Sequence, residues 1–396
     1  MSSRRGSSAL VLIIVFALLV GGLGIWYQPK PVSPAENLEI SLDKAVNKLS
    51  PELTVRVYDS MGNLKTVIVK EDDLVLNNFK LWLSAWLGTT TASATASTNT
   101  LKDTSNQDRV VTGKKWSTSY IYTWCDSASG TGNKGGIMAL GTGTTAPTVS
   151  DYGCETIYGA FVNLDTTAPV YNSTTGEIVV VNTFSITDTV SISEVVLGYN
   201  WVGPSTTAYS FALFRDTFSP ISVENGDTVA IAYVIDLDDT GFTNNFGVIL
   251  AEVFRSVADG TTSTSKTIVD KTGTNKALEC YDDDTEYVPA LTIRTANPVS
   301  SWINVGTSST ATSRSHYALV SEVEDISGGV VTHVISGDVW VQGNVYCAEA
   351  RTITEAGYFC YIGDGNPSPF MLFRDTFAGV SVDAEEWVNA KFVIGM

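Results

Sequence analysis

A six-residue sequence, Leu-Phe-Arg-Asp-Thr-Phe, occurs twice in this chain of 396 residues, and this repeat constrains the fold more than any other feature. The first copy covers residues 213–218 and the second covers residues 372–377. Each copy leads into a short apolar strand pattern, a turn and a second strand pattern, so we expect each to form a closing β-hairpin. The first turn contains the favoured Asn-Gly pair, whereas the second, at residues 383–386, has no glycine and should be of a different type.

Three further landmarks recur in the same order: an Asn-Asn-Phe sequence that begins a helical pattern, a Gly-Thr turn after an apolar strand, and an Ile-Ser-Glu or Ile-Thr-Glu sequence. Asn77 recurs 167 residues later as Asn244, and Arg215 recurs 159 residues later as Arg374. The separation falls along the chain, as small loop deletions in one copy would produce. A period of this length indicates duplicated domains and not a solenoid, whose repeats have about 20–50 residues. We place the boundary near residues 238–241.

The fold class follows from the spacing of apolar residues within each copy. Phe79 and Trp82 begin a core-facing helical pattern, and the second copy repeats it; the remaining apolar runs are short, rich in β-branched and aromatic residues, and separated by turn residues. We therefore predict a mainly β protein with two homologous β-sandwich domains, residues 53–240 and 241–396, each with one core-packing helix. A hydrophobic content of 44% is enough to fill such cores.

The N-terminal residues 1–27 have the pattern of a cytoplasmic tip followed by a transmembrane or signal-anchor helix. Arg4 and Arg5 precede an uncharged apolar run at residues 9–27, which is about as long as a bilayer core requires and longer than the apolar part of a usual cleaved signal peptide. Positive charge favours the cytoplasmic side. We expect residues 9–27 to bind the membrane, with the bulk of the chain extracellular, on a cell surface or a virion.

Residues 28–52 are predicted to form a stalk that contains a short helix. A helix-capping sequence at residues 33–36 precedes Leu38 and Leu42, which lie four residues apart as on one helical face. We therefore predict a short amphipathic helix at about residues 34–49.

The composition excludes one large class of partners. The net charge of −18 opposes binding to nucleic acid, since a polyanion requires a basic face. Charged residues make up only 17% of the chain, and the polar surface is supplied by Ser, Thr, Asn and Gly, as is typical of secreted β proteins. We predict no nucleic-acid partner and a solvated acidic surface.

Five cysteines and one glycosylation sequon are consistent with an external location. Cys347 and Cys360 flank a predicted strand pair and are the first disulfide candidates; Cys125 with Cys154 is the second. A bond across so short a loop would contribute about 3 kcal/mol in the chain-entropy view. The alternative, that all five are buried free thiols, stays open. Asn172 begins the Asn-Ser-Thr sequon and is the glycosylation candidate.

No catalytic or cofactor-binding set emerges from the sequence. Residues 141–146 match a dinucleotide fingerprint by letter, but Pro147 follows where the helix that receives the pyrophosphate should begin. His316 and His333 lack both the further ligands of a zinc site and a nucleophile elbow. We therefore predict no catalytic residues, no cofactor and no enzymatic activity.

An acidic run provides the calcium candidates Asp282, Asp283, Asp284 and Glu286. Carboxylate oxygens are the ligands that calcium prefers, but these four lack the alternate spacing of calcium loops. A solvated acidic loop is the favoured interpretation.

The charged pairs Arg215–Asp216 and Arg374–Asp375 lie inside the repeated hexapeptide. One interpretation is ligand recognition at two equivalent sites; the other is that the charges pin the strand pair. Both copies keep phenylalanines on either side, so the pairs are predicted to be a structural repeat motif.

With these motifs described, the chain resembles a module of uncharacterised structural proteins of tailed phages and archaeal viruses that is described as tail-fibre-like. The resemblance covers most of residues 72–236 and depends on residues 141–148 with Asp151, on residues 192–194 and on residues 213–223 with 226–228. It implies a structural role and is nearly silent on the ligand.

Three functional hypotheses follow. The first is a membrane-anchored, non-enzymatic structural or adhesive protein on a cell or virion surface, whose two β domains contact other copies or other surface or virion proteins. The second is a subunit of an archaeal extracellular filament, since residues 4–7 resemble the leader of archaeal type IV-like pilins. The third is a carbohydrate-binding or hydrolytic surface protein with Trp201, Trp302 or Trp340 as sugar platforms.

Overall fold

The computed structural model describes residues 38–71, 74–87, 98–112, 114–115, 121–123, 135–164, 169–202, 208–237, 241–254, 266–278, 291–293, 301–323, 330–335, 337–362 and 368–396. Strands dominate this part of the chain, so the predicted mainly β class is confirmed. Its two helices lie where the Asn-Asn-Phe patterns predicted them.

The elements up to residue 240 are β1 (Leu38–Tyr58), β2 (Leu64–Lys70), β3 (Leu74–Val75), α2 (Asn77–Leu87), β4 (Thr98–Lys102), β5 (Asp108–Thr112), β6 (Lys114–Lys115), β7 (Ile121–Thr123), β8 (Gly135–Gly141), β9 (Ile157–Asn163), β10 (Val170–Asn172), β11 (Glu177–Ser185), β12 (Val190–Val202), β13 (Ala208–Val223) and β14 (Thr228–Leu237). Those after residue 240 are α3 (Asn244–Phe254), β15 (Lys266–Val269), β16 (Asn275–Leu278), β17 (Leu291–Ile293), β18 (Ser301–Gly306), β19 (Val331–Ile335), β20 (Asp338–Cys347), β21 (Arg351–Ile362), β22 (Ser368–Val382) and β23 (Glu386–Gly395).

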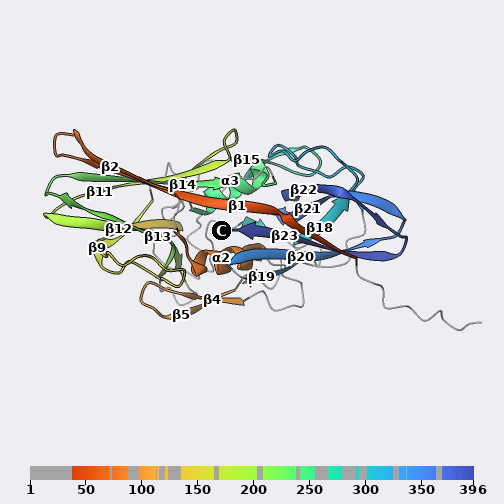
Figure 1. The fold of residues 1–396 in the computed structure, drawn as a ribbon, viewed down its shortest axis with the longest axis horizontal. Helices are drawn as coiled ribbons and strands as arrows, with labels where there is room; N and C mark the ends of the chain where they lie inside the picture. Colours follow the sequence, from red (N-terminus) through yellow and green to blue (C-terminus); the bar gives the residue numbers. More distant parts are fainter. Residues whose placement is uncertain are drawn as a thin grey trace, which may run out of the picture.

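One eight-stranded sheet runs along the molecule and contains strands from both halves of the chain (Figure 1). Its order is β10-β11-β14-β1-β23-β20-β19, with β2 paired to β1. The long strand β1 lies in the middle: residues 49–58 pair antiparallel with β14, and residues 38–48 pair parallel with β23. The sheet therefore continues across residue 240, where the sequence predicts a domain boundary.

Two smaller sheets contain the repeated hexapeptide. In the five-stranded sheet β3-β13-β12-β8-β9, Val196 pairs with Arg215; in the three-stranded sheet β18-β21-β22, Gly357 pairs with Arg374. The β12–β13 and β21–β22 hairpins have the same register and interruptions at equivalent positions, just before Glu194 and just before Glu355. The sequence repeat thus corresponds to two hairpins of matching geometry.

The prediction of a closing hairpin after each hexapeptide is wrong. The hexapeptide strands β13 and β22 pair with the strands before them, whereas β14 and β23 join the large sheet. Each turn therefore carries the chain from one sheet to another. Gly226 has φ +93° in the first turn, and Glu385 has φ +67° in the second, where no glycine is present.

The prediction of an amphipathic helix at about residues 34–49 is also wrong, because the chain from residue 38 onward belongs to strand β1. The sequence Leu-Glu-Ile-Ser-Leu-Asp at residues 38–43 alternates apolar and polar residues, which is the period of a strand. Pairing with β23 and β14 decides between the two patterns, since the strand environment outweighs a weak local helix preference. Residues 28–37 lie outside the described part.

The two halves also share one hydrophobic core. Helix α2 packs against β19 and β20 of the second half, while α3 packs against β10 and β11 of the first. The rings of Phe79 and Phe254, one from each helix, are stacked with centroids 6.4 Å apart. The hydroxyl of Tyr358 donates a hydrogen bond to the backbone oxygen of Leu87 at 2.8 Å. Burial of apolar surface therefore stabilises the halves together.

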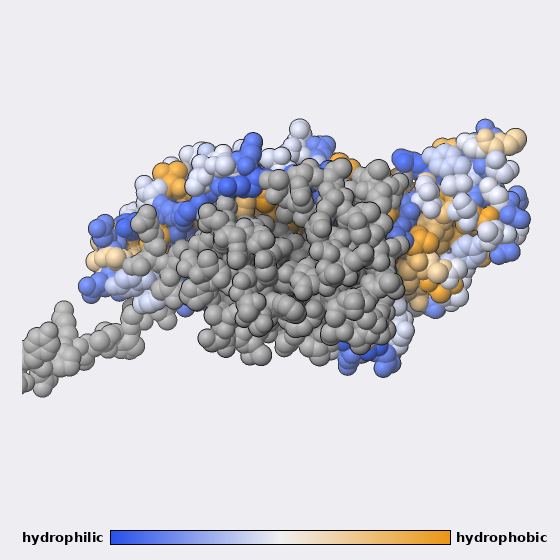
Figure 2. All heavy atoms as spheres, turned by 180° about the vertical axis from the view of Figure 1, so that it is seen from behind, coloured by the Kyte–Doolittle hydropathy of each residue, from blue (hydrophilic) through white to orange (hydrophobic). Residues whose placement is uncertain are grey.

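Exposed apolar residues are found on strands β2, β9, β10 and β11. Figure 2, the view from behind, shows apolar colour at the end that carries β2, β9, β11 and β12 in Figure 1. Leu64, Val67 and Val69 of β2 and Ile157 and Val162 of β9 are exposed. Exposed apolar side chains that lie next to one another often mark contact surfaces.

The predicted membrane anchor at residues 9–27 lies outside the described residues. Within the part that the structure describes, no helix has both the length and the apolar character needed to span a bilayer.

Candidate functional site

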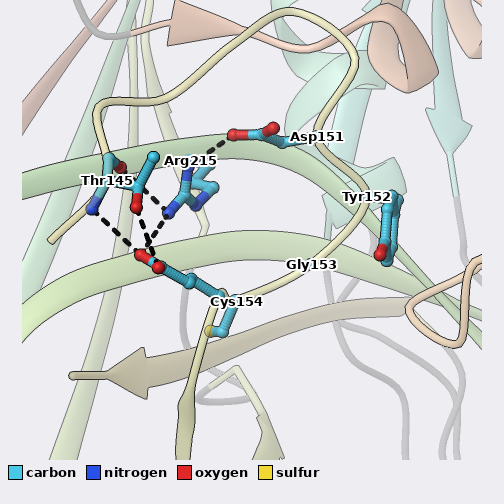
Figure 3. A pocket seen from close by; sticks show the side chains of 7 residues that line it. Thr145, Asp151, Tyr152, Gly153, Cys154 and Arg215 are labelled. Carbon is cyan, nitrogen blue, oxygen red and sulfur yellow. Dashed lines mark hydrogen bonds and ion pairs between the residues drawn. The ribbon is translucent and has the colours of Figure 1, made fainter. Parts of the chain in front are cut away.

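The structure brings a group of charged side chains together around Arg215 at the end of the five-stranded sheet (Figure 3). Strand β8 ends at Gly141 and leads into the Gly-Thr turn; β12 contributes Glu194, and β13 contributes Arg215. Antiparallel pairing places Glu194 opposite Gly141. The turn, the glutamate and the arginine thus meet at one sheet end although they are far apart in sequence.

Arg215 and Glu194 form an ion pair that is almost completely excluded from water. The Arg215 Nε donates to Glu194 Oε1 at 2.6 Å, and the two side chains are only 4% and 0% exposed. The guanidinium also forms an ion pair with Asp151 and donates through Nη2 to the backbone oxygen of Thr145 at 3.2 Å. Since Glu194 lies in β12 whereas Asp151 and Thr145 lie in the turn, the arginine fixes the turn against the sheet.

The Glu194 carboxylate is further held by backbone N–H groups. Gly143 donates at 3.2 Å and Glu155 donates at 2.8 Å. A Cβ at Gly141 would overlap the carboxylate, and one at Gly143 would lie 2.6 Å from Glu194 Oε2. The glycines of the apparent dinucleotide fingerprint therefore make room for the side-chain carboxylate of Glu194.

The two carboxylates at the rim of the turn have lowered pKa values. For Asp151, burial acts to raise the pKa, but hydrogen bonds from Thr148 and from Arg215 outweigh it and lower the pKa below its usual range. The pKa of Glu155 is lowered mainly by hydrogen bonds from the backbone N–H and the hydroxyl of Thr145. Both groups are therefore ionised near neutral pH and are occupied as hydrogen-bond acceptors.

The second half repeats this arrangement around Arg374. Its Nε donates to Glu355 Oε2 at 2.8 Å, and its Nη2 donates to the backbone oxygen of Thr310 at 3.1 Å. The N–H of Ser308 donates to the Glu355 carboxylate at 3.2 Å, as Gly143 does in the first half. We call the two arrangements the Arg215 lock and the Arg374 lock.

One difference between the locks is the side chain beside the guanidinium, where His316 takes the place of Asp151. Arg374 Nη1 lies 2.7 Å from His316 Nδ1, and the N–H of Ser313 also donates to this atom at 3.2 Å. Because a guanidinium can only donate, Nδ1 must be unprotonated and the ring neutral. Burial first, and then the charge of Arg374, lower the pKa of His316, while Glu355 acts in the opposite direction. The two homologous turns therefore differ in the titratable group that contacts the arginine.

A hollow of about 290 Å³ lies beside the Arg215 lock and is lined by Asp151, Tyr152, Cys154, Glu155 and Arg215, together with two other turn residues (Figure 3). Cys154 is the one thiol in this lining. Burial raises its pKa well above the usual value, Glu194 adds to the increase, and Arg215 only partly opposes it. The thiol is therefore protonated at neutral pH and is poorly suited to act as a nucleophile.

The aspartates of the hexapeptide have separate roles. Asp216 is buried, forms an ion pair with Lys70 of β2 and accepts a hydrogen bond from the N–H of Thr217 at 2.7 Å. Asp375 is half-buried and accepts the equivalent bond from the N–H of Thr376 at 2.7 Å. Both arginines and both aspartates are thus engaged in structural contacts.

The predicted disulfide between Cys347 and Cys360 is not present, since both are buried free thiols. Cys347 lies in β20, which pairs with β23, whereas Cys360 lies in β21, which pairs with β18 and β22. The two strands belong to different sheets, a separation that the short sequence distance does not reveal. Cys154 is also a free thiol, and Cys125 lies outside the described residues.

The remaining candidates have mixed outcomes. Asp282, Asp283, Asp284 and Glu286 lie outside the described residues. Among the residues that are described, no group of three or more His, Cys, Asp or Glu side chains is placed to hold a metal ion. Asn172 is exposed at the end of β10, and its Oδ1 accepts a hydrogen bond from the N–H of Thr174 at 3.0 Å.

Two of the three proposed sugar platforms are not freely exposed rings. Trp302 is buried and stacked on Phe359, with ring centroids 5.6 Å apart. The ring of Trp340 is covered by the ammonium group of Lys391 at 3.8 Å. For Trp201 the structure describes only the backbone, within β12.

Sequence reasoning identified the repeated arginines but missed their partners Glu194 and Glu355, and it assigned no role to Asp151 or His316. One signal was available: a single glutamate recurs after an Ile-Ser or Ile-Thr pair and before apolar residues in each copy, and a charge in such a position usually requires a buried partner.

Comparison with protein-family models, with curated proteins and with solved structures finds no match to this chain.

Proposed function

We propose that this chain is a non-enzymatic structural or adhesive protein of a cell or virion surface, anchored in a membrane by residues 9–27. Its two duplicated halves would act through contacts with other copies of the chain or with other surface or virion proteins. The division into domains at residues 53–240 and 241–396 is part of this proposal, as the record of a duplication.

One observation carries the proposal: the most deeply buried charged groups of the repeat are used to hold its architecture. In both locks the same arginine–glutamate pair fixes the same turn through matching hydrogen bonds. A catalytic acid or base needs a proton that it can give up to a substrate or accept from one. Glu194 and Glu355 are instead fully buried and ion-paired.

The contact surface is expected at the end of the molecule that carries β2 and β9. Leu64, Val67 and Val69 are exposed on β2, which pairs on one side with β1. Among the described strands no second partner covers its other edge, and an open apolar edge is suited to protein contacts.

Protease treatment of intact cells that express the full chain tests the location. External protease should degrade the β-rich part while a cytoplasmic marker protein stays intact. Protection of the β-rich part until the membrane is opened would contradict the proposed orientation.

Self-association of the purified chain in detergent tests the contact surface. Changing Val67→Lys together with Val69→Lys should reduce association measured by sedimentation, because each lysine places a charge on the apolar strand. Ser60→Lys, in the exposed turn beside β2, is the matched control and should leave association unchanged. Equal association of all three proteins would remove this surface from the proposal.

The filament hypothesis stays as the second candidate, because the described fold begins with β1 only a short distance after the predicted apolar segment. Residues 28–37 can span at most about 35 Å when fully extended, so the fold would lie close to a fibre core formed by residues 9–27. N-terminal sequencing of the mature protein decides: a first residue of Ser7 supports the filament, whereas Met1 or Ser2 supports an uncleaved anchor.

A further inference from the structure

Strands β14 and β23 hold equivalent places in the large sheet. Each follows its hexapeptide strand, and each pairs with the strand before that hairpin in the same register, Val180 with Tyr233 and Val341 with Phe392. On its other edge each of them pairs with β1. One strand therefore fills two equivalent edges, one in each half.

The first half supplies its own strand for this edge and the second half does not. In the first half, residues 49–58 of β1 and the whole of β2 precede α2. In the second half, only residues 238–243 separate β14 from α3. No strand pair can fit into so short a connection, so the edge of β23 is covered from outside its own repeat, by residues 38–48.

The two pairings differ in strength. Residues 49–58 form ten consecutive antiparallel pairs with β14, and most of the same segment pairs with β2 on its other side. Residues 38–48 form parallel pairs with β23 in two short blocks, interrupted between Ser41 and Val46. Parallel pairing is slightly less stable per residue, and interruption lowers the specificity of register. Residues 38–48 are therefore the part of β1 that is most easily released.

The edge of β23 cannot remain uncovered without cost. Val388, Ala390, Phe392 and Ile394 of β23 are fully buried in the shared core. Without a neighbouring strand, the backbone N–H and C=O groups of β23 would form an open edge beside this core. The partner that fits is an extended peptide with alternating apolar and polar residues, as in the sequence of residues 38–43.

We propose that the β23 edge is an acceptor site for an extended strand, and that residues 38–48 of a second copy of this chain can occupy it in place of the chain's own segment. Pairing with β14 and β2 keeps residues 49–58 in place, so the exchange pivots between residues 48 and 49. The released eleven-residue segment reaches about 36 Å when extended, which is enough to bridge two molecules. The inference depends on the strand pairing and is independent of the proposed surface function.

Cysteine pairs in the full chain, purified in detergent, test the exchange directly. Ile40 pairs with Ala390, so a copy with Ile40→Cys is mixed with a differently tagged copy with Ala390→Cys and oxidised. The matched control uses Thr54→Cys and Ala232→Cys, which pair in the antiparallel part of β1. Each single variant mixed with the wild type reports any bond to a native cysteine.

We expect a covalent dimer that carries both tags from the Ile40→Cys and Ala390→Cys mixture, and none from the control mixture. A single chain with both changes at residues 40 and 390 should close the bond internally. Failure of the mixture to form the dimer, with or without the internal bond, overturns the proposal. A dimer from both mixtures would show general unfolding and would overturn it as well.

A synthetic peptide of residues 38–48 tests the acceptor site by itself. It is added, with a fluorescent label, to the wild type and to Ile40→Pro, because proline removes a backbone donor from the resident segment. In the wild type the linked segment competes at an effective concentration in the millimolar range, so the apparent affinity should be on the order of 100-fold weaker than in the variant. Equal weak binding to a folded Ile40→Pro variant would contradict the acceptor site. If Ile40→Pro does not fold, the cysteine mixtures decide, since they contain no proline.

Discussion

Removal of the Arg215 guanidinium is the sharpest test of the structural role assigned to the two locks. Arg215→Met keeps the apolar stem and deletes the charge that faces the fully buried Glu194. Breaking a buried ion pair by removing one partner costs about 3–5 kcal/mol, because the other charge stays buried. Gly143 and Glu155 still donate N–H groups to the carboxylate, so we expect the lower end, about 3 kcal/mol.

Urea unfolding followed by tryptophan fluorescence measures this change in the full chain. With a slope of about 3 kcal/mol per molar urea, the transition midpoint should fall by about 1 M. Arg374→Met should give a similar decrease, because Glu355 likewise keeps N–H donors from Ser308 and Val320.

The control is Lys102→Met, which removes an exposed ion pair with Asp108 and should change the free energy of unfolding by about 0.5 kcal/mol or less. Combining Arg215→Met with Glu194→Gln should recover part of the lost stability, because the uncompensated charge is then absent. If Arg215→Met unfolds at the same urea concentration as Lys102→Met, the lock does not stabilise the fold and the reasoning is refuted.

Three further predictions concern other parts of the fold. Gly141→Ala should lower the urea midpoint of unfolding, because the added Cβ would meet a carboxylate and a backbone oxygen. Gly153→Ala is the control and should leave the midpoint unchanged, because the nearest atom to its Cβ is 3.5 Å away. Equal midpoints for the two variants would show that the turn moves to accommodate the Cβ. His316 has a lowered pKa in the folded state, so the unfolded state binds more protons. The stability that His316 contributes is therefore complete above its ordinary pKa of 6.5 and is lost as the pH falls below it. Urea unfolding at pH 7.5 and pH 5.0, values chosen to bracket about 6.5, should show a smaller difference in stability between the two pH values for His316→Gln than for the wild type. Cys347 and Cys360 should both be alkylated by iodoacetamide in denaturant without prior reduction, as measured by mass spectrometry of the intact chain; failure of both to react would show that they are bonded.

Local patterns in the sequence were sufficient where a segment's own side chains decide its structure. The Asn-Asn-Phe patterns predicted both helices, because apolar residues at helical spacing can bury one face wherever the helix packs. The repeat predicted equivalent strands, and the structure places Arg215 and Arg374 at equivalent positions of two hairpins with matching register. The recurrence of each charged residue indicated an architectural role before its partner was known.

What the tertiary structure alone decided is which strands pair. Residues 38–49 carry both a helical and a strand pattern, and only the edges of β14 and β23 select the strand. The hexapeptide strands pair backward in the chain, and Glu194 meets Arg215 only through the β12–β13 register. The physical reason is the same in each case: local periodicity records which face of a segment is apolar, whereas the choice of neighbour depends on backbone hydrogen bonds and burial between segments that are distant in sequence.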